Sequence, residues 1–383
     1  MLNVRVGYVA LVSARSTIQT KVDSQKQALV RMLEGGSISG LTMTNCVMDD
    51  RGDDLVQFGD QASVRLRRSG RGHSFLNLFV AYPQIYRAIE RGLLSSGVGV
   101  VYIRKPAVFG LAFVGWLRRL RRKGLRVILE IPTFPYDREL RPGSLLQRMD
   151  GLARRRLVGA VDLIATFSED ESIFGVPCVR VLNCVSVHEL PLSRRAPSSG
   201  GIRFTCVSAL EPWHRLDRLL ASLIGCWDEG DARVSILNIV GSGPALSELM
   251  DMVAVSPLSN ARVVFHGPVY GEELSAIFDE TDLAVGNLEV RSDRGLESVQ
   301  ALKHREYAAR GVPFIYGLSD WSFANSAYAL QVPEGDICLD FIVDWYSRLA
   351  VDGVAIRRDA LRFRWEAQFE AAFQALDELG CPT

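Results

Sequence analysis

The chain has 383 residues, of which 48% are hydrophobic and 23% charged, with a mean hydropathy of +0.10. This composition excludes a disordered chain, and the length predicts two domains with sizeable cores. The longest near-apolar stretch, residues 107–117, is too short to span a bilayer. Seven scattered cysteines without zinc spacing, and an N-terminus without the features of a signal peptide, lead us to expect a cytoplasmic protein.

The charge is balanced overall but divided between the halves of the chain. Residues 1–190 contain 27 Lys and Arg against 17 Asp and Glu, with basic clusters at 65–71, 118–123 and 154–156. The second cluster follows an apolar, Trp-bearing segment, a pattern that suits docking on anionic lipid headgroups. Basic residues also complement the dipole at helix C-termini without any partner, so both interpretations stay open. We expect no nucleic-acid partner, since no binding motif accompanies the charge.

Ten short apolar runs predict buried strands, and helical patterns lie between most of them. The runs cover residues 4–11, 98–103, 126–131, 163–167, 178–182, 203–208, 235–240, 262–266, 283–288 and 313–316. This alternation predicts an α/β protein with two Rossmann-like, doubly wound domains that face each other across a cleft. A stretch rich in Pro, Ser and Gly at 191–201 predicts the linker. We therefore expect domains over 1–195 and 196–355, with the helical segment 356–383 packing back toward the first.

Lys303 is the only lysine after Lys123, in a part of the chain that otherwise uses arginine. The spacing predicts a helix over residues 298–310, with Ser298 as N-cap and Gly311 and Pro313 ending it. A helix that follows a strand in this way presents its N-terminus to phosphate. Lys303, Glu306 and Arg310 share one face of this helix, so the lysine suits a diphosphate and the carboxylate suits ribose hydroxyls. The alternative is a surface helix on which Lys303 and Glu306 form a solvated ion pair.

Two further loops follow predicted strands in the same half. Gly-Ser-Gly-Pro at 241–244 opens a helix, and its small residues would let backbone amides approach a phosphate or base. Leu246 stands where a dinucleotide fingerprint has its third glycine, which argues against a nicotinamide enzyme. Phe-His-Gly-Pro-Val at 265–269 ends another strand and suits contact with a planar base, although a lone histidine such as His266 is more often packed than catalytic.

The order of these motifs, ending in Leu-Lys-x-x-Glu-Tyr-x-Ala-x-Gly-x-Pro at 302–313, resembles the donor domain of retaining glycosyltransferases of the GT-B fold. The likeness is to family 4 enzymes that build bacterial surface polysaccharides. Trp-His-Arg-Leu-Asp-Arg at 213–218 and Glu-Ile-Pro-Thr-Phe-Pro-Tyr-Asp at 130–137 are similar to two further segments of such enzymes. The resemblance covers about residues 200–330 closely and much of the remaining chain through these segments.

The resemblance implies a transferase that moves a sugar, with retention and without a metal or other cofactor, from a nucleotide sugar, UDP-linked, to a saccharide acceptor. We expect this acceptor to be linked to a lipid. The first domain would bind the acceptor and the second the donor. Catalytic candidates are Lys303, Arg291, Glu130 and Asp137, with Tyr136 beside them in the acceptor segment. Donor-binding candidates are Gly241, Ser242, Gly243, His266, Gly267, Val269, Lys303, Glu306, Arg294, His214 and Arg218. An anionic membrane surface is a further expected partner, with the protein peripheral on the inner face of the membrane.

This chain departs from the family pattern at several positions. Ala209 and His214 stand where many members have an Arg and a Lys on the diphosphate, and Arg215 replaces a signature glycine. Ser298 stands at the first carboxylate of a Glu-x7-Glu pattern. Three alternatives therefore remain beside the transferase: a nucleotide-sugar epimerase on the same fold, a non-catalytic partner subunit, and a nicotinamide enzyme. In the acceptor segment, Pro132 and Pro135 could simply shape a loop.

Overall fold

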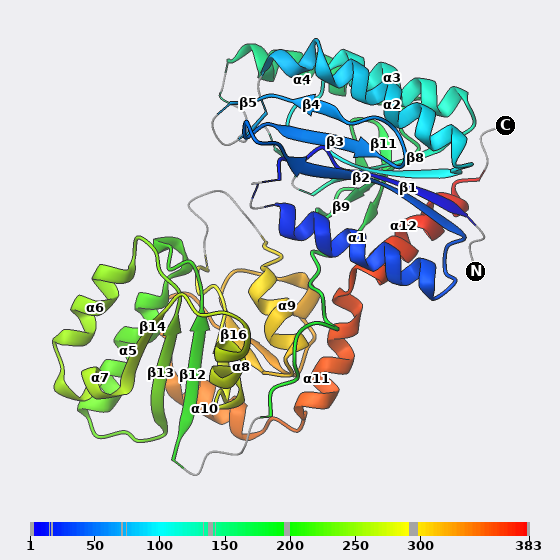
Figure 1. The fold of residues 1–383 in the computed structure, drawn as a ribbon. Helices are drawn as coiled ribbons and strands as arrows, with labels where there is room; N and C mark the ends of the chain where they lie inside the picture. The colour runs from blue at the N-terminus through cyan, green and yellow to red at the C-terminus, as the bar shows by residue number, and fades with distance from the viewer. Residues whose placement is uncertain are drawn as a thin grey trace. The chain divides into compact units, whose positions relative to one another are not determined.

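The chain forms two units in the computed structural model (Figure 1). The described residues are 4–14, 16, 18–69, 72–73, 75–132, 134–136, 141, 143–194, 200–290 and 298–380. The first unit consists of Met1–Leu182 with Trp365–Thr383, and the second of Asn183–Arg364. The division thus falls at Leu182, earlier than the boundary expected after residue 195.

Hydrogen bonds explain why the segment after Leu182 belongs to the second unit. The backbone N–H of Val185 donates to the carbonyl oxygen of Phe363 at 3.1 Å. The Ser193 hydroxyl donates to the carbonyl oxygen of Phe278 at 2.7 Å. These bonds hold a stretch of Pro- and Ser-containing chain that composition alone marks as a linker.

The first unit contains a sheet of nine strands among the described residues, in the order β10-β11-β9-β8-β7-β1-β2-β3-β4. The strands are β1 (Arg5–Val9), β2 (Gly40–Met48), β3 (Asp54–Phe58), β4 (Val64–Leu66), β7 (Val100–Arg104), β8 (Arg126–Ile131), β9 (Leu163–Thr166), β10 (Ser172–Ile173) and β11 (Val176–Arg180). Pairing is parallel from β11 to β2, while β3, β4 and β10 pair antiparallel at the two edges. A small hairpin of β5 (Arg68–Ser69) and β6 (Gly72–His73) lies apart from this sheet.

Helices cover both faces of the first sheet. They are η1 (Phe75–Leu78), α1 (Gln19–Glu34), α2 (Ala81–Ser95), α3 (Leu111–Arg122), α4 (Leu145–Arg154) and α12 (Trp365–Glu378). Figure 1 shows α2, α3 and α4 over one face, and α1 and α12 over the other. Phe369 of α12 packs edge-on against Tyr8 of β1 and Tyr102 of β7, so the end of the chain completes the core of the first unit.

The second unit contains a six-stranded sheet among the described residues, parallel throughout, in the order β14-β13-β12-β15-β16-β17. Its strands are β12 (Ile202–Val207), β13 (Val234–Val240), β14 (Val263–Gly267), β15 (Leu283–Val285), β16 (Phe314–Tyr316) and β17 (Ala329–Gln331). Its helices are η3 (Pro212–His214), α5 (Leu216–Asp228), α6 (Leu246–Ala254), α7 (Pro257–Arg262), α8 (Gly271–Asp279), α9 (Leu302–Ala309), η4 (Trp321–Phe323), α10 (Leu339–Ser347), α11 (Gly353–Ala360) and η5 (Leu361–Phe363). All ten predicted strands are present, and the prediction of two doubly wound, Rossmann-like sheets is confirmed.

Hydrophobic side chains build a separate core in each unit. Trp116 of α3 lies in the first core and Trp227 of α5 in the second, and both are almost fully buried. Within the described parts of the chain, no helix is long and apolar enough to cross a membrane.

Candidate functional site

The second sheet changes direction at β12, which points to its ligand site. The chain runs from β12 through β13 to β14 on one side, and from β15 through β16 to β17 on the other. The helices that follow β12 and β13 therefore lie on one face and α8 and α9 on the other (Figure 1). The loops after β12 and β15 diverge, and ligands of such sheets bind in the crevice between them. A cavity of about 960 Å³ lies here, lined by residues 210–218 after β12, by Ala245, Glu248 and Leu249, and by residues 334–336.

Two glycines let the loops after β12 and β13 touch through their backbones. A β-carbon on Gly241 would collide with the carbonyl oxygen of Ser208, and one on Gly243 with that of Ala209. Gly241 also has a φ of 124°, which favours glycine, and its N–H donates to the carbonyl oxygen of Gly267 at 2.7 Å. The absence of a side chain at Gly241 and Gly243 thus lets the two loops pack against each other. Contact between the backbone amides of these glycines and a phosphate stays a prediction.

The turn after β12 is held in an unusual backbone conformation. Leu210 has a φ of 44° and Arg215 a φ of 51°, both in the left-handed region, where a residue other than glycine costs roughly 1–2 kcal/mol. The signature described above has glycine at the position of Arg215, and the positive φ gives the physical reason. Because these two strained residues flank Glu211–His214, we infer that contacts with the surrounding structure hold this turn in place.

Lys303 lies in the first turn of α9 and points to this turn. Its ammonium group donates a hydrogen bond to the Ser208 hydroxyl oxygen at 3.0 Å. Burial, partly offset by Cys206, lowers the pKa of Lys303 below its usual value, because desolvation disfavours the charged amine. The Ser208 oxygen lies 2.6 Å from Nδ1 of His214, so one hydroxyl bridges the lysine and the histidine.

The helix begins later than the sequence predicts. Its N-cap is Ala301, so the prediction of Ser298 as N-cap is wrong. Asn183 binds Gln300 twice, at 2.7 and 2.9 Å, and the N–H of Val299 donates to the carbonyl oxygen of Ser319 at 2.8 Å. These bonds hold residues 298–300 outside the helix, which brings Lys303 closer to the helix N-terminus than expected.

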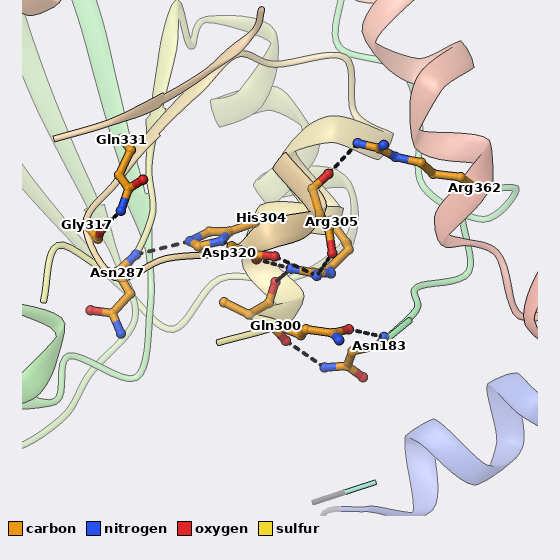
Figure 2. A network of polar contacts seen from close by, with 11 residues as sticks. Asn183, Asn287, Gln300, His304, Arg305, Gly317, Asp320, Gln331 and Arg362 are labelled. Atoms are coloured by element: carbon orange, nitrogen blue, oxygen red, sulfur yellow. Dashed lines mark hydrogen bonds and ion pairs between the residues drawn. The ribbon is translucent and has the colours of Figure 1, made fainter. Parts of the chain in front are cut away.

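A buried polar network anchors the opposite side of α9 (Figure 2). Arg305 forms an ion pair with Asp320, and neither side chain is exposed to solvent. Nδ1 of His304 lies 3.0 Å from the same carboxylate, and its Nε2 is 3.4 Å from the backbone N–H of Asn287. Burial lowers the pKa of His304, so the ring is neutral at pH 7. The network links the start of α9 to the loop after β15. It thereby holds the helix in the orientation that points the Lys303 side chain to the turn after β12.

Solved structures with this architecture were found, although no protein-family model and no curated protein matches the chain. Anabaena HepE in complex with UDP-glucose is 12% identical with a TM-score of 0.54, over 98% of this chain and 100% of that one. A UDP-forming α,α-trehalose-phosphate synthase from Burkholderia vietnamiensis is 12% identical with a TM-score of 0.54, over 99% of each chain. AviGT4, a glycosyltransferase of avilamycin A biosynthesis, is 14% identical with a TM-score of 0.52, over 98% of each.

The chain has the GT-B glycosyltransferase fold. The resemblance recognised in the sequence is thereby confirmed at the level of the fold. In the second GT-B unit, His214 and Lys303 meet at Ser208, and both were predicted as donor-site residues from distant parts of the sequence. Ser208 was missed. The available signal was its place at the end of the strand predicted over residues 203–208.

Glu306 and Arg310, expected on the same helix face as Lys303, pair with each other. One carboxylate oxygen of Glu306 accepts from Nε and Nη2 of Arg310, each at 3.2 Å. The Arg310 guanidinium lies 4.6 Å from the centre of the Phe278 ring. The alternative of an ion pair between Lys303 and Glu306 does not occur among the described residues, since their partners are Ser208 and Arg310. A contact of Glu306 with ribose stays a prediction.

The other donor-site candidates surround the same carboxyl edge of the sheet. His266 of β14 shares a hydrogen bond of 2.9 Å with the side chain of Asn238, Gly267 follows it with a φ of 68°, and Val269 is buried. Arg218 lines the cavity, but its guanidinium donates to backbone carbonyls of Leu288 at 2.6 Å, Pro333 at 2.7 Å and Gly335 at 2.9 Å. In this structure Arg218 therefore ties loops together, and direct contact with phosphate stays a prediction.

Glu130 occupies a closed position in the first unit. Its side chain is 0% exposed, and its carboxylate accepts hydrogen bonds from Arg104 and, at 2.6 Å, from Gln25. Nearby, the Tyr136 hydroxyl donates to Asp150 at 2.9 Å, and this tyrosine is also buried. Two of the three residues predicted to handle an acceptor, Glu130 and Tyr136, are thus engaged inside the unit, and contact with an acceptor stays a prediction.

Three predicted site residues lie outside the described residues: Arg291, Arg294 and Asp137. Ser242 lies between the two glycines of the loop after β13 and is exposed. Within the described parts of the chain, no three His, Cys, Asp or Glu side chains form a group that could hold a metal ion.

Proposed function

We propose that this chain is a retaining glycosyltransferase that transfers a sugar from a nucleotide sugar, UDP-linked, to a saccharide acceptor. The observation that carries the proposal is the placement of Lys303 at the first turn of α9, bound to Ser208 at the switch point of the second sheet. A cation and a helix N-terminus at the crevice of a Rossmann-like sheet suit a diphosphate.

The reaction needs a group that stabilises the leaving diphosphate. The bond between the anomeric carbon and the phosphate oxygen breaks, and a bond from the acceptor oxygen to the same carbon forms on the same face. The proton of the acceptor hydroxyl passes to the departing phosphate, which lessens the need for a protein base. Lys303 offsets the negative charge that develops on the diphosphate, a contribution of about 10²–10³ in rate for one well-placed donor.

The proposal of UDP as the nucleotide draws on two of the structures with the same fold. HepE is in complex with UDP-glucose, and the trehalose-phosphate synthase is described as UDP-forming. Because the identities are 12% in both cases, we transfer only the nucleotide class, as a proposal, and leave the sugar to experiment.

A thermal-shift screen of nucleotide sugars, followed by product analysis, tests the proposal. We expect selective stabilisation by one UDP-sugar, since a ligand at 100 times its Kd stabilises by about 2.7 kcal/mol. With an acceptor present, a glycosylated product and UDP should appear. Conversion of the donor alone would show an epimerase, and binding of donor without turnover of any acceptor would show a non-catalytic subunit.

We further propose that the acceptor is lipid-linked and that the first unit docks on an anionic membrane. A cavity of about 760 Å³ lies between α2 and α3, with Arg87, Arg91, Arg119 and Lys123 around it and apolar Tyr86 and Leu94 in its wall. Glu90 accepts from Arg119 at 3.2 Å and from Lys123 at 2.9 Å, so one carboxylate pairs with two of these four cations. Cationic edges beside apolar walls suit an anionic amphiphile, at about 1 kcal/mol for each basic residue.

Co-sedimentation with vesicles tests this docking. The protein should bind vesicles of phosphatidylcholine with phosphatidylglycerol, and bind phosphatidylcholine alone weakly. The double variant Arg87→Glu, Arg91→Glu should lose binding, whereas Arg155→Glu, Arg156→Glu, with the same change in net charge at exposed positions of the same unit, should retain it. Equal loss in both variants would show that net charge, and not the α2–α3 cavity, governs binding.

A further inference from the structure

Three side chains at the switch point of the second sheet form a hydrogen-bonded chain with one consistent direction. The backbone N–H of Glu211 lies 3.4 Å from Nδ1 of His214 and can only donate, so Nδ1 is an acceptor without a hydrogen. The Ser208 hydroxyl, 2.6 Å from the same nitrogen, must then donate to it. Its oxygen is left to accept from the ammonium group of Lys303 at 3.0 Å. The hydrogen of the neutral His214 ring consequently resides on Nε2.

The backbone holds Ser208 rigidly in this role. Its N–H donates to the carbonyl oxygen of Val240 at 2.9 Å, which continues the pairing of β12 with β13. Gly241 lies against its carbonyl oxygen so closely that a β-carbon there would collide with it. The backbone position of Ser208 is therefore fixed. Its hydroxyl, which donates to His214 and accepts from Lys303, has little freedom to rotate.

Resting on the proposed function, we propose that Ser208 is a positioning residue of the transfer reaction. It holds the Lys303 amine at the crevice and fixes His214 in the Nε2–H form, so that both side chains present donors to the leaving diphosphate. Ala209 and His214 stand where related signatures have an Arg and a Lys, so this chain relies on correct placement of fewer permanent cations. Preorganised donors stabilise developing charge best because they need no reorganisation during the reaction.

The first test is the tautomer of His214, which does not depend on activity. Nitrogen NMR distinguishes protonated from unprotonated ring nitrogens, and the spectrum of a His214→Gln variant identifies the His214 signals among the five histidines. We expect Nδ1 without and Nε2 with a hydrogen in the wild-type protein. In Ser208→Ala only the longer contact of the Glu211 N–H at 3.4 Å still favours this form, so a larger share of the Nδ1–H tautomer should appear. A wild-type ring that is protonated on Nδ1 would overturn the proposal.

The second test is turnover. Ser208→Ala should lower kcat for the nucleotide sugar about 10- to 100-fold, the loss expected when a hydrogen bond to a charged group is removed. Donor KM should change much less, and Ser208→Thr, which keeps a hydroxyl, should recover most of the lost turnover. The matched control is Ser235→Ala near the start of β13, where the hydroxyl donates to the backbone carbonyls of Gly201 and Ile202 at 3.3 and 3.4 Å.

The outcomes separate this proposal from the function on which it rests. If no nucleotide sugar is turned over by the wild-type protein, the proposed function fails, while the NMR result still decides whether Ser208 orients His214. If the wild-type protein is active and Ser208→Ala matches it in kcat, the positioning role is refuted. If Ser208→Ala does not fold, as judged by circular dichroism, the Ser208→Thr variant and the wild-type tautomer decide the question.

Discussion

The two sheets of this protein each reverse direction once, and the polar groups at the two reversals are arranged in opposite ways. In the first unit the reversal lies between β1 and β7, where Glu130 and Arg104 neutralise each other with 0% and 6% of their side chains exposed. In the second unit it lies between β12 and β15, where Lys303, Ser208 and His214 are partly exposed beside a cavity.

This difference separates charge that serves the fold from charge that suits a ligand. A buried pair with satisfied hydrogen bonds has no capacity left for a substrate, and removal of one partner leaves an uncompensated charge. A lysine whose partners are a hydroxyl and, through it, an imidazole keeps its positive charge for an anion. We therefore expect substitutions at the first reversal to affect stability and substitutions at the second to affect turnover.

The largest effect should follow from Glu130→Ala. Removing this carboxylate leaves the Arg104 guanidinium buried without its partner, which should lower the free energy of unfolding by about 3–5 kcal/mol. Urea denaturation followed by circular dichroism measures this. Asp344→Ala, which breaks an exposed pair with Arg348, is the control and should cost no more than about 0.5 kcal/mol. A Glu130→Ala protein that is stable but inactive would contradict this stabilising role and support a role for Glu130 in handling the acceptor.

The alkaline limit of activity should identify Lys303 next. Its charged form is required, and burial lowers its pKa, so kcat/KM should fall about tenfold per pH unit beginning below 10.5, the usual value for lysine. Lys303→Arg, which stays charged at any accessible pH, should retain some activity and lack this limb. An unchanged alkaline limb in Lys303→Arg would assign it to another group.

The buried network behind α9 should make stability depend on pH. The pKa of His304 is lowered from 6.5 by burial, so the unfolded chain binds the proton before the folded one does. Stability should accordingly be complete above pH 6.5 and decline as the pH falls below it, by at most about 1.4 kcal/mol per unit. His304→Gln should flatten this decline between pH 7 and 5, whereas replacement of exposed His188 by Gln should leave it as in the wild-type protein.

The smallest effect concerns the turn after β12. Arg215 has a φ of 51°, so Arg215→Gly relieves a left-handed residue and should raise the free energy of unfolding by about 0.5 kcal/mol. Arg155→Gly, at an exposed helix end with a φ of −62°, is the matched control and should lower it by up to about 1 kcal/mol. A loss in both variants would mean that the positive φ of Arg215 carries no strain.

Local patterns were sufficient to predict strands dominated by apolar residues but not strands of mixed composition. The interior strand β8 (Arg126–Ile131) is apolar at four of its six positions and almost wholly buried, and the sequence reveals it directly. By contrast β2 (Gly40–Met48), which carries three polar side chains among its nine residues and is mostly half-exposed, was missed, as was β17 at the far edge of the second sheet. Such strands are defined by their neighbours and less by their own composition.

The candidate site shows the same limit. Lys303 and His214 were found because each occupies a recognisable place in a motif. Arg305 was not, because a charged residue in a helix is normally expected at the surface, and its partner Asp320 lies beyond the following strand. Ser298 was misplaced as a cap because the bonds between Asn183 and Gln300 join segments that are far apart in sequence.

Turnover of the UDP-sugar chosen by the thermal-shift screen, compared between Lys303→Ala and Lys105→Ala, tests the central claim most directly. Lys105 directly follows β7 at the reversal of the first sheet, so the two variants compare the two sheet reversals directly. We predict that Lys303→Ala loses about 10²–10³ in kcat, with a thermal midpoint close to that of the wild-type protein. Wild-type kcat in Lys303→Ala, or an equal loss in both variants, would contradict the assignment of Lys303 to the leaving diphosphate.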